Sequence, residues 1–108
     1  MTAFEKETIL SFEDAIEYTS GGVISKQVTK SKSGNITLFS FDKGQGLSEH
    51  KTVYDAIVQI LDGEAEITIN GKIHHLTKGN SIIMPANIPH ALKATERFKM
   101  LLTMIRNE

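Results

Sequence analysis

The chain has 108 residues and contains neither cysteine nor tryptophan. Without cysteine there can be no disulfide framework, no thiol nucleophile and no zinc or iron–sulfur site built on cysteine ligands. This cysteine usage is typical of reducing compartments, so we expect a cytoplasmic location. Aromatic residues make up only 6% of the chain, which leaves few side chains for stacking nucleic-acid bases.

An excess of positive charge is also missing. Lysine and arginine number 12 against 13 acidic residues, and the net charge is −1, whereas a surface that binds nucleic acid has to be basic. No apolar run approaches the roughly 18 residues of a membrane span. Residues 1–10 carry acids and lysines where a signal peptide would have an apolar core. We therefore predict neither nucleic acid nor a membrane as a partner.

What is present is a succession of short strands in a single domain. We expect residues 35–108 to form a barrel and residues 1–34 to form an extension that packs on it. Within the extension we predict a helical turn over residues 11–16 and a strand over residues 23–29. Turn signals separate segments rich in β-branched residues, and this pattern favours a sandwich or small barrel. Further strands are predicted over residues 36–41, 53–61, 64–69, 72–76, 81–84, 91–95 and 98–105, with the 53–61 strand ending at Asp62-Gly63.

The dipeptide Asn70-Gly71 predicts a tight β-hairpin. Across a two-residue turn, Ile67 lies opposite His74, and Glu66 lies opposite His75. His74 then shares the interior face with apolar residues, where a hydrogen-bonded histidine is commoner than a ligand. A bulge in the hairpin would exchange the two faces.

Two histidines stand 40 positions apart in segments with matching glycine and proline spacing. The first segment contains Gly44, His50 and Gly63, and the second contains Gly79, Pro85 and His90. Residues from about 36 to 105 resemble a small single-domain cupin on these segments. The family's first motif is commonly Gly-x5-His-x-His-x3,4-Glu-x6-Gly, and its second is Gly-x5-Pro-x-Gly-x2-His-x3-Asn.

The chain departs from both motifs at the positions that carry chemistry. Thr52 stands in place of the second histidine and Ala56 in place of the glutamate. Asn87 replaces the inner glycine and Ala94 the final asparagine. Only two of the four metal ligands of the family remain, and two imidazoles with a hydroxyl do not meet the needs of a divalent transition metal.

The resemblance implies an all-β fold, a double-stranded β-helix in which two antiparallel sheets form a jelly-roll barrel. It also implies a homodimer. The strand around residues 57–61 is apolar on both faces, and its outer face needs to be covered, which supports association. The pocket that we expect inside the barrel is lined by His50, Thr52, Tyr54, Ala56, His74, Met84, His90 and Met100.

Three functions compete for this pocket. In the first, the protein binds a small molecule through His50 and His90, with a reduced or absent metal site. In the second, it is a metal-dependent enzyme of the dioxygenase, isomerase or decarboxylase type. Asp55 or His74 would then complete a site for iron, manganese, nickel or zinc. In the third it is a regulatory module, although no helix-turn-helix pattern follows the barrel, so we expect it not to read DNA itself.

Overall fold

The computed structural model describes residues 4–107, and within them the protein is built from eight strands and no helix. None of these residues belongs to a helix long and apolar enough to cross a membrane. The all-β fold class is therefore confirmed. The strands are β1 (Val23–Ser31), β2 (Gly34–Phe41), β3 (Gly46–His50), β4 (Tyr54–Ile69), β5 (Lys72–Thr77), β6 (Ser81–Met84), β7 (His90–Lys93) and β8 (Phe98–Arg106).

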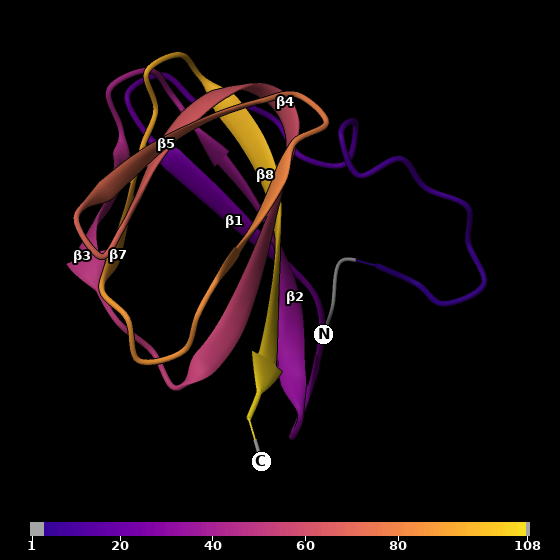
Figure 1. Cartoon of the computed structure of the whole chain (residues 1–108). Helices are drawn as coiled ribbons and strands as arrows, with labels where there is room; N and C mark the ends of the chain where they lie inside the picture. The colour runs from indigo at the N-terminus through magenta and orange to yellow at the C-terminus, as the bar shows by residue number, and fades with distance from the viewer. Residues whose placement is uncertain (1–3, 108) are drawn as a thin grey trace.

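The strands form two antiparallel sheets that share the long strand β4 (Figure 1). Sheet I has the order β1-β2-β8-β4-β6, and sheet II has the order β5-β4-β7-β3. The first half of β4 pairs with β8 and β6, and its second half pairs with β5 and β7. Side chains of both sheets belong to one core cluster, so the sheets face each other as the two walls of a jelly-roll barrel.

The prediction that a strand ends at Asp62-Gly63 is wrong, because β4 continues through these residues to Ile69. The register with β8 shifts between Ile60 and Asp62, and Gly63 has a φ of 76°. A register shift of this kind bends a strand while hydrogen bonding continues on either side. The turn signal therefore marks the bend that carries β4 from sheet I to sheet II.

The hairpin register is confirmed. Ile67 pairs with His74 and Glu66 with His75. Both turn residues have positive φ values, 49° for Asn70 and 80° for Gly71, as the two-residue turn of a twisted hairpin requires.

Aromatic and branched side chains fill the space between the two sheets. Phe41 and Phe98 are completely buried and stack with ring centroids 4.6 Å apart. Val58, Ile60 and Ile67 from β4 belong to the same core. Because side chains alternate along a strand, Phe41 of β2 and Phe98 of β8 lie on the inner face of sheet I, and their sequence neighbours lie on its outer face.

The predicted helical turn is a hydrogen-bonded turn over residues 12–15, closed by bonds from Asp14 N to Ser11 O and from Ala15 N to Phe12 O, each 3.2 Å long. Each bond joins residues three apart, so the segment stops short of an α-helix. The turn belongs to residues 11–20, here called the N-terminal strap. Within the strap Ile16 is buried, although it lies outside the barrel core.

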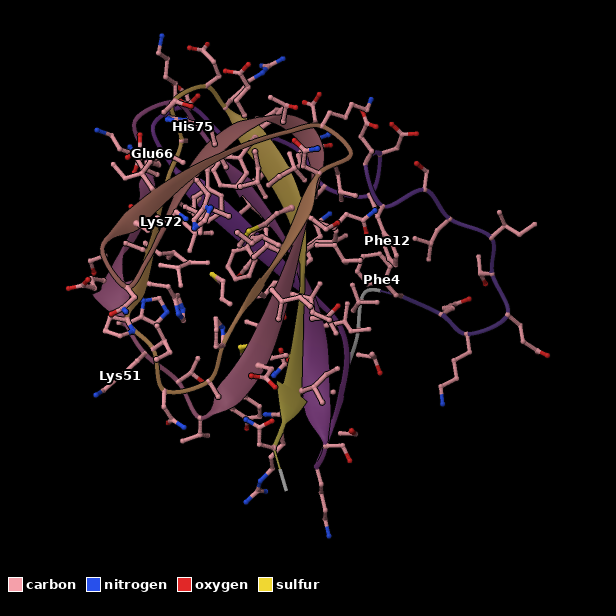
Figure 2. All side chains as sticks on the ribbon, viewed as in Figure 1. Phe4, Phe12, Lys51, Glu66, Lys72 and His75 are labelled. Atoms are coloured by element: carbon pink, nitrogen blue, oxygen red, sulfur yellow. The ribbon has the colours of Figure 1, made fainter. Side chains whose placement is uncertain are left out.

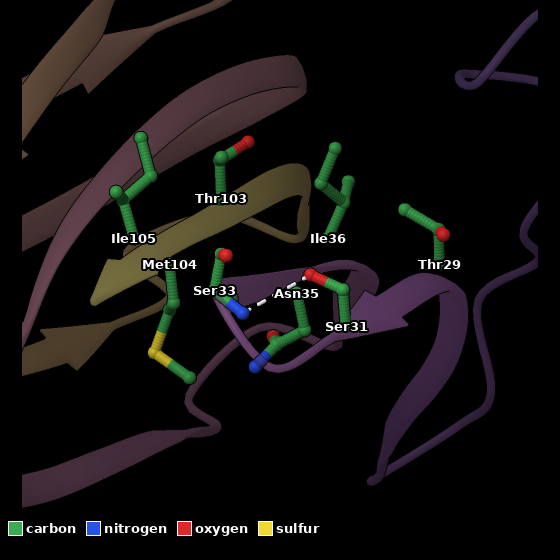
Figure 3. Close-up of a pocket in the computed structure, with 9 residues that line it drawn as sticks. Thr29, Ser31, Ser33, Asn35, Ile36, Thr103, Met104 and Ile105 are labelled. Atoms are coloured by element: carbon green, nitrogen blue, oxygen red, sulfur yellow. Dashed lines mark hydrogen bonds between the residues drawn. The ribbon is translucent and has the colours of Figure 1, made fainter.

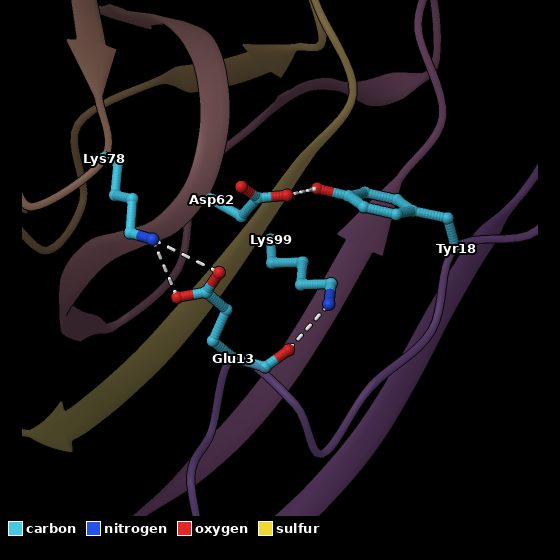
Figure 4. Close-up of polar contacts among 5 residues, drawn as sticks. All are labelled: Glu13, Tyr18, Asp62, Lys78 and Lys99. Carbon is cyan, nitrogen blue, oxygen red and sulfur yellow. Dashed lines mark hydrogen bonds and ion pairs between the residues drawn. The ribbon is translucent and has the colours of Figure 1, made fainter.

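Side chains of the barrel hold the strap against the outer face of sheet I (Figure 4). The Tyr18 hydroxyl donates to an Asp62 carboxylate oxygen at 2.5 Å, and Lys99 Nζ donates to the Glu13 carbonyl at 2.6 Å. A further hydrogen bond, which Figure 4 does not draw, is donated by Ser40 Oγ to the Glu17 carbonyl at 2.6 Å. These contacts fix the strap over one half of the outer face, beside Ser40 and Lys99, which pair across β2 and β8.

Candidate functional site

The fold brings His50 and His90 side by side, although 40 positions separate them. Strand β3 ends at His50 and β7 begins at His90, and the two residues are direct cross-strand partners. Their ring centroids are 4.5 Å apart and the ring planes meet at 68°. His90 is buried, with 3% of its surface exposed, whereas His50 is exposed. The pair therefore spans from the interior of the barrel to its surface.

Hydrogen bonds orient both rings. His50 Nδ1 lies 2.7 Å from the Ser48 carbonyl oxygen, and His90 Nδ1 lies 3.3 Å from the Ile88 carbonyl oxygen. A carbonyl oxygen can only accept, so each Nδ1 carries the proton and donates it. In the neutral ring the lone pair is then on Nε2. Each imidazole is thereby held as a hydrogen-bond acceptor for a partner at Nε2.

Burial keeps His90 neutral at physiological pH. Desolvation is the main reason why the pKa of His90 lies below its ordinary value of 6.5, and repulsion from a protonated His50 lowers the pKa further. The hydrogen bond to Ile88 acts in the opposite direction and is the smallest of the three effects. A neutral His90 presents an acceptor, and not a cation, to the interior.

A small cavity lies beside the two rings, with a volume of about 30 Å³. This is the space of one or two water molecules. The imidazoles are the polar side chains of its wall, and three methionines form much of the rest. The lining consists of Leu47, His50, Ala56, Met84, His90, Leu92, Met100, Leu102 and Met104.

Five of the eight side chains expected in the pocket line this cavity, namely His50, Ala56, Met84, His90 and Met100, and three do not. Thr52 lies between β3 and β4, where its Oγ1 accepts a hydrogen bond from Tyr54 N at 3.0 Å. Tyr54 begins β4 opposite Arg106, at the end of sheet I. His74 is half-buried on the edge strand β5, on the side of β4 away from β7.

Four residues that line the cavity are not among those predicted from the sequence: Leu47, Leu92, Leu102 and Met104. Three of them follow from strict alternation, because Leu92 is two residues after His90, and Leu102 and Met104 follow Met100 on the same face of β8. No sequence pattern indicates that Leu47 faces the interior. The segment Gly46–His50 lacks the alternating pattern by which the other strands were predicted, although it forms β3.

The residues proposed as a third metal ligand do not reach the histidines. Asp55 is one position before the inward-facing Ala56, and its Oδ1 accepts a hydrogen bond from Ala86 N at 2.9 Å. Neither Asp55 nor His74 lines the cavity. Among residues 4–107 no three histidine, aspartate or glutamate side chains lie close enough together to hold a metal ion. The donor set therefore does not fit a resident metal with three protein ligands.

The loop before His90 keeps its shape although the inner glycine of the motif is replaced. Asn87 has a φ of 64°, in the left-handed region that glycine and asparagine tolerate best. Its N–H donates to the Thr52 carbonyl at 2.7 Å, and Asn70 N donates to the Pro89 carbonyl at 2.8 Å. These bonds join the β6–β7 loop to the two neighbouring loops and position His90.

The motif spacing, the shared strand and the paired histidines agree with a comparison against known families. The sequence profile of the family described as "Cupin domain" matches residues 37–105. The chain belongs to the cupin family. The match covers β3 to β7 completely, β2 from Thr37 and β8 as far as Ile105, so it spans most of the barrel.

Solved structures show the same barrel. A conserved protein of unknown function from Streptococcus pyogenes is 38% identical, with a TM-score of 0.92 over 97% of this chain and 92% of that chain. A cupin superfamily protein from Desulfitobacterium hafniense is 32% identical, with a TM-score of 0.89 over 95% of this chain and 94% of that one.

Two curated relatives share a named role. An HTH-type transcriptional regulator, PuuR, of Escherichia coli is 30% identical over 95 residues, which cover 84% of this chain and 51% of the regulator. This cupin thus spans about half the length of the curated relatives that it matches.

Proposed function

We propose that this cupin binds a small molecule at the mouth of its barrel without a resident metal ion. The pair of imidazoles, His50 and His90, carries the proposal. Both Nδ1 atoms donate to backbone carbonyls, which leaves an Nε2 acceptor on each of two rings whose centroids are 4.5 Å apart beside an apolar wall. Pockets that are mostly apolar, with few oriented polar groups, are typical of ligand sites. The absence of cysteine supports a reducing, cytoplasmic location for this binding.

The chemistry of the wall defines the class of ligand. Two Nε2 acceptors favour a ligand that donates hydrogen bonds through N–H or O–H groups, attached to a compact apolar body. A cavity of about 30 Å³ holds only part of such a ligand. Methionine side chains are flexible and polarizable, so Met84, Met100 and Met104 can repack to enlarge the site.

A matched pair of probes tests this proposal. Phenol carries one O–H donor on an apolar ring, and benzene has the same ring without the donor. We expect phenol, in titrations followed by methyl NMR, to shift the signals of Met84, Met100 and Met104 at lower concentration than benzene does. His50→Ala removes one acceptor and is expected to weaken phenol binding about five- to tenfold, the equivalent of one hydrogen bond of about 1 kcal/mol.

The control variant is His75→Ala, because His75 is exposed on the outer face of sheet II. Equal binding of phenol and benzene, or an equal effect of His75→Ala and His50→Ala, would show that the imidazoles do not select the ligand. Metal analysis of protein purified without an affinity tag is expected to find far less than one ion per chain. A stoichiometric metal ion would overturn the metal-free proposal.

The PuuR relative favours a second candidate, in which the barrel is a sensing module. The matched part of that protein makes up about half of a transcriptional regulator, so a ligand bound by the present barrel would serve as a signal and not as a substrate. A sensor returns its ligand unchanged, whereas an enzyme converts it. Recovery of the bound molecule from the purified protein, unaltered after long incubation, supports sensing, and its conversion rules sensing out.

A further inference from the structure

Thioether and imidazole groups gather in the cavity between the two sheets. Three of the four methionines of the chain line this cavity, together with two of its four histidines. Figure 2 shows sulfur atoms, in yellow, inside the barrel. No carboxylate or hydroxyl group of the described residues 4–107 belongs to the wall. The cavity therefore presents soft sulfur and nitrogen donors and lacks the oxygen donors of an ordinary cation site.

Two of the methionines flank the position where the cupin motif has a glutamate. Ala56 stands at that position in β4, and its cross-strand partners are Met84 on β6 and Met104 on β8. Met84 is buried, and Met104 packs against the core. Figure 3 shows the side chain of Met104 on the opposite side of β8 from Thr103 and Ile105. Both thioethers thus lie beside the small side chain that replaces the acidic ligand.

The two imidazoles complete the donor set. Because Nδ1 of His50 and of His90 each donates to a backbone carbonyl, Nε2 is the nitrogen that remains for an ion. Histidines that bind metals commonly have their other N–H tied in this way. The ring centroids are 4.5 Å apart, and His50 is exposed, so an ion can reach the pair from solvent.

The charge of the ligands decides which kind of ion fits. Thioethers and neutral imidazoles bring no negative charge, so the charge of a bound ion stays uncompensated. The cost of moving an ion out of water rises with the square of its charge, so it is about four times larger for a divalent ion than for a monovalent ion of equal size. Thioether ligands also select Cu(I). Both effects favour a soft monovalent ion over iron, manganese, nickel or zinc.

The larger hollow of the molecule does not offer this combination of donors. It has a volume of about 240 Å³ and lies beside the β1–β2 turn (Figure 3). Its polar side chains are hydroxyls and one amide, and no imidazole of the described residues reaches it: Thr29, Ser31, Ser33, Asn35 and Thr103. The soft donors are thus concentrated in the cavity inside the barrel.

We propose that this cavity captures a soft monovalent ion, Cu(I) or Ag(I), between Nε2 of His50 and His90 and the sulfur atoms of Met84 and Met104. The methionines, which lie outside the cupin metal motif, take the place of its missing histidine and glutamate. Uncharged ligands release an ion more readily than thiolates do, so the ion exchanges with solution and is not a resident cofactor. It would compete with the small molecule for Nε2, but its binding does not require that molecule.

Silver nitrate in chloride-free buffer tests the site, because Ag(I) does not change its oxidation state under these conditions. Methionine methyl groups labelled with ¹³C report on the sulfur atoms by NMR. We expect the Met84 and Met104 signals to shift and to saturate at one Ag(I) per chain, while a tenfold excess of Zn(II) leaves them in place. Signals that do not move with Ag(I), or that move equally with Zn(II), would overturn the proposal. Phenol is absent from this titration, so its outcome is independent of the small-molecule proposal.

Matched variants identify the ligands. Leucine keeps most of the volume of methionine, so the double variant Met84→Leu, Met104→Leu removes both sulfur atoms from a packed core. In calorimetric titrations with Ag(I) we expect this variant and His50→Ala each to bind at least about tenfold more weakly than the wild type. The control His75→Ala removes an imidazole from the outer surface (Figure 2) and is expected to bind as the wild type does.

Circular dichroism checks that each variant keeps its strands. Wild-type affinity in the folded double leucine variant would show that the thioethers are not ligands, and wild-type affinity in folded His50→Ala would show the same for the imidazole. Either result would refute the proposed site.

Discussion

Among single residues, His90 links folding stability to pH. The pKa of its imidazole in the folded protein lies below 6.5, first because of desolvation and then because of His50. The unfolded chain therefore takes up a proton more readily. The stabilisation from a neutral His90 is fully present above pH 6.5, and it is lost as the pH falls through 6.5 towards the folded pKa.

We expect urea unfolding to show this dependence as a difference between the wild type and His90→Gln. The difference in the free energy of unfolding between the two proteins should shrink as the pH falls from 7.5 to 5.5, because only the wild type has to keep this side chain neutral. Carboxylates titrate in both proteins, so their contribution cancels. A difference that is constant over this range would contradict the assignment.

Alanine substitutions at two glycines distinguish the stability cost of a left-handed backbone conformation from the stability cost of a steric clash. Gly63 and Gly44 both have positive φ values, 76° and 87°. A Cβ on Gly63 would lie 1.8 Å from the Arg97 carbonyl oxygen, whereas a Cβ on Gly44 would meet no atom within 4 Å. Gly44→Ala is therefore expected to cost about 1–2 kcal/mol from backbone strain alone.

Gly63→Ala has the same backbone strain and, in addition, has to displace the backbone of Arg97 and Phe98, where β8 begins beside the bend of β4. We expect it to lower the free energy of unfolding by at least about 4 kcal/mol, as large steric changes in a packed region do. Chemical denaturation of both variants provides the comparison. Equal losses in Gly63→Ala and Gly44→Ala would mean that the bend relaxes and that the close approach to Arg97 is unimportant.

Among the elements, the N-terminal strap depends on a few polar contacts with the barrel. The pKa of Tyr18 is raised far above its ordinary value of 10.0 by desolvation and by the hydrogen bond to Asp62, so the hydroxyl stays protonated and keeps donating (Figure 4). Tyr18→Phe removes the donor and keeps the ring beneath Arg97 and Lys99. We expect a loss of about 1–2 kcal/mol, as for a hydrogen bond to a charged acceptor.

Amide hydrogen exchange localises this effect. Residues 11–20 are expected to exchange faster in Tyr18→Phe, while the core strand β4 keeps its protection. The control is Glu96→Gln, which removes a surface ion pair with Lys43 whose side chains are 55% and 68% exposed. Such pairs contribute less than about 1 kcal/mol. Faster exchange throughout β4 in Tyr18→Phe would show that the strap and the barrel unfold as one unit.

The sequence predicted correctly those elements that depend on a few neighbouring residues. Asn70-Gly71 determines a hairpin register through backbone angles alone, and this prediction held for every pair that it named. The bend of β4 depends on pairing with four different strands, which no local pattern encodes, so Asp62-Gly63 was interpreted as an end. The spacing of glycines and prolines around His50 and His90 was enough to identify the paired histidines. The positions of Thr52, Tyr54 and His74 depend on the course of the loops and on the strand order in sheet II, which the sequence pattern does not reveal.

For the whole molecule, the homodimer that the cupin resemblance implies would couple stability to protein concentration. We expect it to use the apolar row Ile36, Thr103, Ile57 and Ile83, which are successive cross-strand partners on the outer face of sheet I. Any partner that binds only the folded state raises the apparent stability by mass action. We therefore expect the Tm of the wild type to rise by several degrees between about 1 μM and 100 μM, because each copy stabilises the other. The Tm of Ile83→Glu, at a residue 62% exposed, is expected to stay constant over this range. The control Ile73→Glu, at a residue 55% exposed on the outer face of sheet II, is expected to rise in Tm as the wild type does. Calorimetry at several concentrations measures all three proteins. A wild-type Tm that is independent of concentration, together with a single species at both limits, would mean that the barrel reaches its full stability alone and that the apolar row on sheet I has no self-partner.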